Sequence, residues 1–364
     1  GGRHRVRRRF VGRRLRPAVT TVTSTVATTA TSHVEAQRTP MSPGVFRVVV
    51  AITAAVTVAA VVAPPSDTVS VAVVMVVVAV LGIPHGAVDH LVAAALGSTA
   101  PTRLTRSAAT PIRPLRFHLA YLAAMLAYGL VWLAIPAVAL AGVLLLSVHH
   151  FGQSDLASLQ LDRWRQGAIQ LSRGLFLVGL VLVANLAAVS PVIDRMGGFD
   201  PSAWAWLAGH TAAWSLVLVG QHLVIGLIVG AQVRDREIIR REAIAVIALT
   251  ALFVAADPLI GFALYFGLWH SLNHLGVLAE VLGHRSGSAA LAPRQLARLA
   301  APRSVASLAA LAILIGGAAA LDQTELVVPV ALIFISMLTL PHMIVVERLW
   351  KAIRLETPSG QRPI

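Results

Sequence analysis

Residues 68–96 read TVSVAVVMVVVAVLGIPHGAVDHLVAAAL and decide the fold of this chain. The run contains no lysine or arginine, and Asp89 is its one acidic residue. A helix of about 20 apolar residues can cross the roughly 30 Å hydrocarbon core of a bilayer, because each residue adds about 1.5 Å. The run therefore predicts a transmembrane helix that carries His85, Asp89 and His90 inside it.

The whole chain is also rich in apolar residues and poor in charged ones. Of its 364 residues 57% are hydrophobic and 13% are charged, and the mean hydropathy is +0.76. Soluble domains have roughly 45–50% apolar and about 25% charged residues, so these values exclude a disordered chain and argue against a soluble enzyme. The absence of cysteine excludes disulfides, thiolate metal sites and cysteine nucleophiles.

Further apolar segments follow to the end of the chain. Ten are predicted, at 45–63, 68–96, 117–135, 137–158, 168–189, 203–230, 243–256, 258–282, 304–321 and 326–348. Because the seventh segment is short and several connections are tight, a count of eight or nine is also compatible with the sequence. The fold class that we predict is an all-α, polytopic transmembrane helical bundle.

The distribution of charge gives the topology. The net charge of +14 by itself would suggest nucleic-acid binding, but 10 of the 30 basic residues lie within 1–47 and most others lie in short loops, which excludes that class. Loops after even-numbered segments are basic, whereas loops after odd-numbered segments are acidic. By the positive-inside rule both termini face the cytoplasm.

Three regions are expected along the chain. Residues 1–44 are predicted to be a disordered Arg/Thr-rich extension, artefactual before Met41, with a transit peptide or a lipid-binding tail as the alternatives. Residues 45–350 are the predicted integral-membrane catalytic domain, and 351–364 are the predicted cytoplasmic tail.

Eight of the thirteen histidines lie on even-numbered segments, about twelve to twenty-two residues from their starts. They therefore form one layer in the cytoplasmic half of the membrane, where an ionisable group costs about 2.5–3.5 kcal/mol. Convergence of side chains from several helices at one depth is typical of a buried metal site. The eight are His85, His90, His149, His150, His222, His270, His274 and His342, and Asp89, Gln153, Asp155 and Asn273 share their layer.

Spacing supports the metal site. In WHSLNHL, His270 and His274 stand at i and i+4 on one helical face. His85 and Asp89 have the same spacing, so the carboxylate is expected to orient the imidazole or to bind the metal itself. The adjacent His149 and His150 point about 100° apart, so one of the two is expected to face the site.

Other interpretations stay open at this point. A single intramembrane histidine such as His222 is more often a hydrogen-bonded structural residue than a metal ligand. For His342 the structural role and the metal-binding role are evenly balanced. Trp269 fits either a cavity wall or core packing. Imidazole suits Zn, Cu, Fe and Ni, and a buried site favours redox-active iron, O₂ and a lipid-soluble substrate. Zinc hydrolysis lacks an HExxH motif and di-iron desaturation lacks HxxHH, while a bis-His haem or a transporter remains compatible.

The motifs GIPHGAVDH, HHFGQSD, WHSLNHL and PHMIVVERLW together resemble the Brp/Blh family, described as membrane β-carotene 15,15′-dioxygenases that supply retinal to microbial rhodopsins. The resemblance extends from about residue 70 to 350. It implies Fe(II) held by His85, His150, His270 and His274. A basic residue is commoner in the family where this chain has Asn273.

The resemblance also implies a reaction and a location. β-Carotene would enter from membrane lipid, react with O₂ at its central double bond and give two all-trans-retinal molecules, in the cell membrane and in functional association with a microbial rhodopsin. The candidates around the iron are Asp89, His90, His149, Gln153, Asp155, His222, Trp269, Asn273 and His342. The alternative is a non-enzymatic transporter or rhodopsin-assembly partner, which predicts no stoichiometric iron. The sequence makes no prediction of an oligomeric state.

Overall fold

All ten predicted segments are helical in the computed structural model, which describes residues 1–2, 41–97, 112–156, 159, 161–197, 201–233 and 235–356. All the regular secondary structure of these described residues is helical, which confirms the all-α prediction. The predicted extension before Met41 lies, apart from the first two residues, outside the described residues. The described residues from Met41 onward belong to one compact unit.

The first half of the bundle contains short helices between long ones. Its elements are α2 (Pro43–Val62), α3 (Asp67–Val77), η1 (Val78–Gly82), α4 (Ile83–Gly86), α5 (Asp89–Leu96), α6 (Ile112–Ala134), α7 (Pro136–Asp155), α8 (Arg163–Gly174), η2 (Leu175–Gly179), α9 (Leu180–Ala184) and α10 (Leu186–Gly197). The second half contains α11 (Pro201–Ala208), α12 (Thr211–Gly230), α13 (Arg236–Ala255), α14 (Pro258–Leu264), η3 (Tyr265–Ser271), α15 (Leu272–Arg285), α16 (Pro293–Ala320), η4 (Thr324–Leu326) and α17 (Val327–Glu356).

Eight helical segments in the described part of the chain are long and apolar enough to cross a membrane. This count lies within the range that the sequence allows. The two other predicted segments, α13 and α14–η3–α15, are also helical, and α13 begins with the charged residues Arg236 and Glu237. Two further predicted segments are divided, because α9 ends before Asn185 and α11 is separate from α12.

The outer surface of the bundle is apolar where lipid would surround it. Large side chains are exposed along α6 and α12, among them Leu126, Leu133 and Leu227, with exposed fractions of 64%, 84% and 74%. Extended apolar surfaces are rare on soluble monomers. The exposed leucines are therefore what a bilayer-embedded bundle requires.

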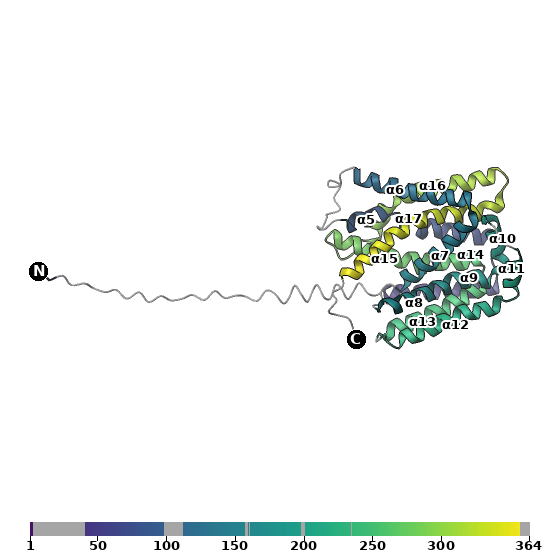
Figure 1. Ribbon diagram of the computed structural model, residues 1–364, viewed down its shortest axis with the longest axis horizontal. Coiled ribbons are helices and arrows are strands. Elements are labelled where there is room, and N and C mark those ends of the chain that lie inside the picture. Colours follow the sequence, from purple (N-terminus) through teal and green to yellow (C-terminus); the bar gives the residue numbers. More distant parts are fainter. Residues whose placement is uncertain are drawn as a thin grey trace. The chain divides into compact units, whose positions relative to one another are not determined.

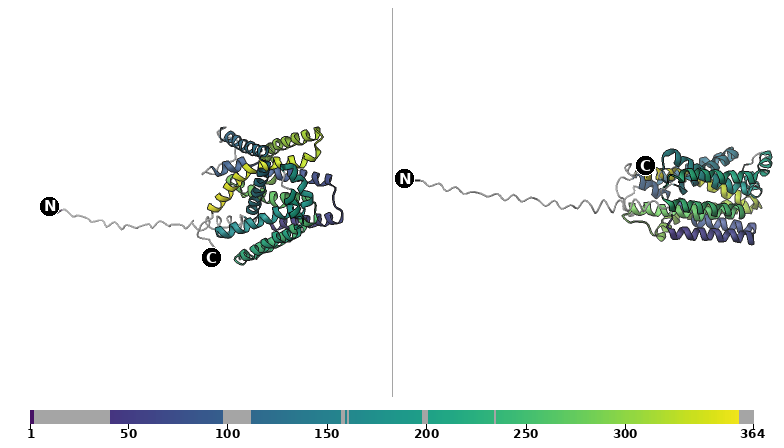
Figure 2. Two further views of the ribbon diagram at one scale, coloured as in Figure 1. Left: turned by 45° about the vertical axis from the view of Figure 1, so that its right-hand side comes forward. Right: turned by 90° about the horizontal axis from the view of Figure 1, so that it is seen from below.

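The long helices run side by side along one common direction (Figures 1 and 2). Helix α2 packs on α13, α3 on α14, and α6 on α17. Helices α7 and α8 cross closely at Gly152 and Gly174, where an added Cβ would overlap the carbonyl oxygens of Gln170 and Val148. This crossing holds the end of α7 that carries His150 against the bundle interior.

Two π-helical turns, η1 and η3, pack against each other in the middle of the bundle. Gly82 and Gly267 make this approach possible, since a Cβ on Gly82 would collide with Phe266 and one on Gly267 would collide with Val77. π-Helical turns are rare and frequent at functional sites. Here η1 leads directly into the short helix that carries His85, and η3 contains His270.

Candidate metal centre

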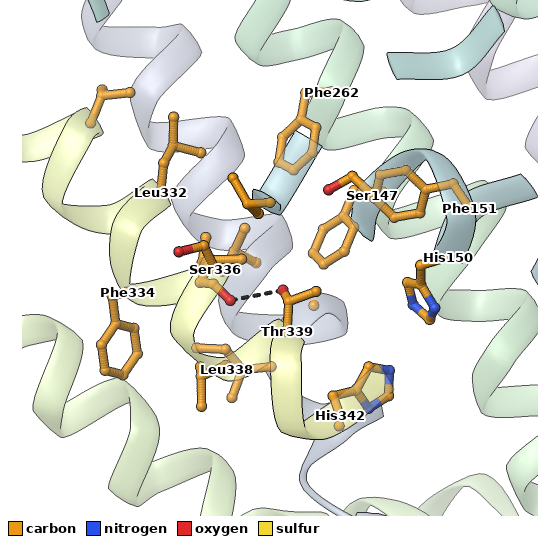
Figure 3. A pocket seen from close by; sticks show the side chains of 18 of the residues that line it. Ser147, His150, Phe151, Phe262, Leu332, Phe334, Ser336, Leu338, Thr339 and His342 are labelled. Atoms are coloured by element: carbon orange, nitrogen blue, oxygen red, sulfur yellow. Dashed lines mark hydrogen bonds between the residues drawn. The ribbon is translucent and has the colours of Figure 1, made fainter. Parts of the chain in front are cut away.

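Five histidine side chains from five elements meet inside the bundle. They are His85 on α4, His150 on α7, His270 on η3, His274 on α15 and His342 on α17, and each is at most 6% exposed. The ring centroids of His85 and His342 lie 4.8 Å apart, and those of His150 and His270 lie 4.7 Å apart. Figure 3 shows His150 and His342 pointing into the same space. We call these five residues the histidine cluster.

The free ring nitrogens of the cluster suit a metal ion. His85, His150 and His342 each offer a nitrogen, and these three atoms lie within 4.8 Å of one another. Both ring nitrogens of His270 and of His274, and Nε2 of His342, are buried without a hydrogen-bond partner in the described residues. Unpartnered buried polar atoms are costly, so this many in one place needs an explanation, and coordination of a metal by neutral imidazole accounts for one nitrogen of each ring.

His270 and His274 lie on one helical face, as their i, i+4 spacing predicts. Their rings are parallel within 3°, with centroids 6.3 Å apart, and the ring of His85 lies 5.5 Å and 5.6 Å from them. Phe266 stacks on His270 from the other side, at 5.8 Å between ring centroids. The pair is therefore held rigidly against His85.

Asp89 orients His342 rather than His85, with which its sequence spacing had paired it. Nδ1–H of His342 donates to the two carboxylate oxygens of Asp89 at 2.9 and 3.1 Å, and the hydroxyl of Tyr121 donates to Asp89 at 3.2 Å. The reason is that α4 ends at Gly86 and α5 begins at Asp89, so the two residues are not on one continuous helix. The bond leaves Nε2 of His342 free to face the cluster, the usual arrangement around a metal-binding histidine.

His150, and not His149, belongs to the cluster. The side chain of His149 is 56% exposed and its Nε2 lies 3.6 Å from Glu347. Gln153, predicted near the metal, donates instead to Glu347 at 2.6 Å. These two residues therefore belong to a polar contact between α7 and α17.

Asp155 and His222 belong to a second buried polar network. Arg173, which is 2% exposed, contacts Asp155 at 3.3 Å and Glu242 at 2.9 Å. The hydroxyl of Tyr265 donates to Asp155, and His222 contacts Ser172 at 2.7 Å and Glu242 at 3.0 Å. The structural interpretation of His222 agrees with these contacts.

Three further residues were predicted near the metal, namely Trp269, Asn273 and His90. None of them belongs to the histidine cluster. The indole N–H of Trp269 donates to Thr53 at 3.0 Å on α2, which favours the core-packing interpretation. Asn273 is 7% exposed, and its side-chain oxygen has no partner among the described residues. His90 lines the cavity described next, together with His118.

A cavity of about 980 Å³ extends from the histidine cluster into the bundle. His85, His150 and His342 form part of its wall, and most of the rest is leucine, valine, isoleucine and phenylalanine. Figure 3 shows Phe262 and Leu332 farther along this wall. The volume is at the upper end of the range of about 300–1,000 Å³ that is common for ligand pockets. An apolar cavity of this size suits a large hydrocarbon.

Comparison with known proteins agrees with this site. The family described as Beta-carotene 15,15'-dioxygenase matches residues 76–350. The chain belongs to the beta-carotene 15,15'-dioxygenase family. The matched range contains all five cluster histidines. The Brp/Blh resemblance predicted from the motifs is thereby confirmed.

Two curated relatives of this dioxygenase family are similar over most of the chain. The Beta-carotene 15,15'-dioxygenase of Uncultured marine bacterium 66A03 is 27% identical over 282 residues, which cover 74% of this chain and 90% of the relative. The Probable beta-carotene 15,15'-dioxygenase Blh of Halobacterium salinarum is 28% identical over 293 residues, covering 73% of this chain and 80% of the relative. No solved structure matches the chain.

Proposed function

We propose that this protein cleaves β-carotene at its central 15,15′ double bond with O₂ and releases two molecules of all-trans-retinal within the cell membrane. The observation that carries the proposal is the histidine cluster, three of whose members form part of the wall of a largely apolar cavity in a member of this dioxygenase family. Retinal is the chromophore of microbial rhodopsins, so we propose a rhodopsin as the functional partner.

The cluster would hold Fe(II). Five buried imidazoles and no thiolate suit iron that binds O₂. His85, His150, His270 and His274 are the ligands that the family resemblance implies, and the position and free Nε2 of His342 support adding it as a candidate. When bound, the iron would supply the redox chemistry that lets O₂ react with the double bond.

The chain itself positions the substrate and excludes water. A hydrocarbon has no group to hydrogen-bond, so its place in the cavity is set by shape and apolar contact alone. Phe151 and Phe266 line the cavity and lie 4.9 Å and 5.8 Å from the ring of His270, between centroids. They would hold the polyene beside the cluster while the surrounding aliphatic side chains keep the site dry.

The test is expression in a cell that accumulates β-carotene. We expect the colour to fade and retinal to form, measured by chromatography of extracts. His270→Ala should abolish both retinal formation and bound iron, whereas His284→Ala, at an exposed position of the following helix α15, should change neither. Retained colour with full-length protein present in the membrane would refute the enzyme assignment.

Metal analysis of the purified protein distinguishes an iron enzyme from a transporter, an assembly partner and a haem protein. We expect stoichiometric iron by mass spectrometry. Absence of iron together with absence of cleavage would favour a transporter or an assembly partner. A Soret band would indicate a haem protein instead.

A further inference from the structure

One part of the cavity wall carries three side chains that can donate hydrogen bonds, whereas most of the wall is apolar. His90 on α5, His118 on α6 and Arg303 on α16 all line the cavity. The rings of His90 and His118 lie 5.5 Å apart between centroids, and α16, which carries Arg303, packs on α4, the helix just before His90. We call these three residues the donor patch.

The donor patch lacks a partner of opposite charge. In the part of the chain that the structure describes, Arg303 forms no ion pair, whereas Arg173 and Arg241 do. Asp89 also lines the cavity, but its oxygens are already engaged by His342 and Tyr121. An arginine carries a permanent charge and five N–H donors and accepts nothing. The patch is therefore suited to a ligand that brings an acceptor oxygen.

β-Carotene cannot be that ligand, because it consists of carbon and hydrogen only. Cleavage changes this, since each retinal carries one carbonyl oxygen at the new end of its chain. Among the molecules that the reaction brings into the cavity, the aldehyde product is the polyene with an acceptor. His90 directly follows Asp89, which bonds to His342 of the cluster and to Tyr121, one helical turn after His118 on α6. The aldehyde is thus formed close to the patch.

We propose that the donor patch binds the aldehyde oxygen of retinal and draws this end of the product away from the histidine cluster. The inference rests on the proposed function and identifies a product site beside it. The same acceptor chemistry occurs in carotenoids with a hydroxyl on the ring, so the experiment must separate these two sources of oxygen.

The experiment compares two ligands that differ in one group. Purified protein in lipid nanodiscs is titrated with all-trans-retinal and with the matching hydrocarbon that carries a methyl group in place of the aldehyde, and quenching of tryptophan fluorescence gives the dissociation constants. Arg303→Met keeps the length of the side chain and removes its charge. A hydrogen bond to a charged group corresponds to roughly tenfold or more in affinity. We expect this loss for retinal and none for the hydrocarbon.

Arg298→Met is the matched control, because Arg298 is exposed on the same helix and does not line the cavity. It should leave both affinities unchanged. Unchanged retinal binding in Arg303→Met would overturn the proposal, and so would equal weakening of both ligands, since that result indicates a change of cavity shape. If Arg303→Met does not fold, His118→Leu serves in the same comparison with the same criteria.

A third titration uses a carotenoid with hydroxylated rings. If Arg303→Met weakens this carotenoid and leaves retinal unchanged, the patch recognises an oxygenated substrate and the product assignment is refuted. Single-turnover cleavage of β-carotene by the unmodified protein is measured alongside. No retinal in that reaction refutes the proposed function, whereas normal cleavage with unchanged retinal affinity refutes only the role of the patch.

Discussion

Replacing Asp89 by Asn should weaken metal binding without removing any candidate ligand. The carboxylate accepts Nδ1–H of His342 at 2.9 and 3.1 Å and is 3% exposed. A hydrogen bond to such a charged group contributes about 1.5–3 kcal/mol. Loss of the partner of a metal-binding histidine typically reduces metal affinity by about 10–100-fold, which is about 1.4–2.7 kcal/mol. The energy of the hydrogen bond and the typical loss of metal affinity therefore agree in size. We expect Asp89→Asn to bind Fe(II) about 10–100-fold more weakly.

The assay is an anaerobic titration of metal-free protein with Fe(II), with the bound metal separated and counted by mass spectrometry. Asp67→Asn is the matched control, since Asp67 also lines the cavity but is the first residue of α3, about 27 Å from His85 along the same helical span. It should bind iron as the unmodified protein does. Unchanged affinity in Asp89→Asn would refute the role assigned to this carboxylate and, with it, the inclusion of His342 among the candidate ligands.

Three further changes test the site and the bundle around it. His150→Ala should lose bound iron by mass spectrometry while His149→Ala keeps it, and equal iron in the two variants would contradict the orientation described here. Gly152→Ala forces a Cβ into the backbone of α8 and should destabilise the protein by about 1–3 kcal/mol or more in thermal unfolding, whereas Gly220→Ala, with open space around it, should be neutral or stabilising. Arg173→Met removes the cation from Asp155, which is 9% exposed, and from Glu242, which is 27% exposed, and should cost up to about 3 kcal/mol, so an unchanged melting temperature would show that the network is dispensable.

Much of the fold follows from the sequence because the bilayer imposes a single rule. Every backbone group inside lipid must be bonded within its own segment, so an apolar run of sufficient length is a helix. Runs such as 68–96 are found as predicted for this reason. The divisions at Asn185 and between α11 and α12 were missed, since they depend on neighbouring helices and leave no mark in hydropathy.

The site was predictable as far as depth and helical face determine it. Histidines on parallel segments at one depth must meet if their helices are neighbours, and His85, His150, His270 and His274 do meet. The same argument also selected His149 and His222, because depth does not distinguish the interior face of a helix from its other faces. Their exposure and bonds depend on helix rotation, which is set by packing against partners distant in the sequence.

The partner of Asp89 shows why local spacing could not complete the site. The i, i+4 rule pairs Asp89 with His85 on a regular helix, and it fails here because α4 ends at Gly86 and α5 begins only at Asp89. The close packing of η1 on η3 depends on two glycines in segments nearly two hundred residues apart, Gly82 and Gly267. Each glycine alone looks like a helix breaker, and only together do they allow the approach that brings His85 beside His270. A substitution at either one should therefore disturb the cluster without changing any histidine.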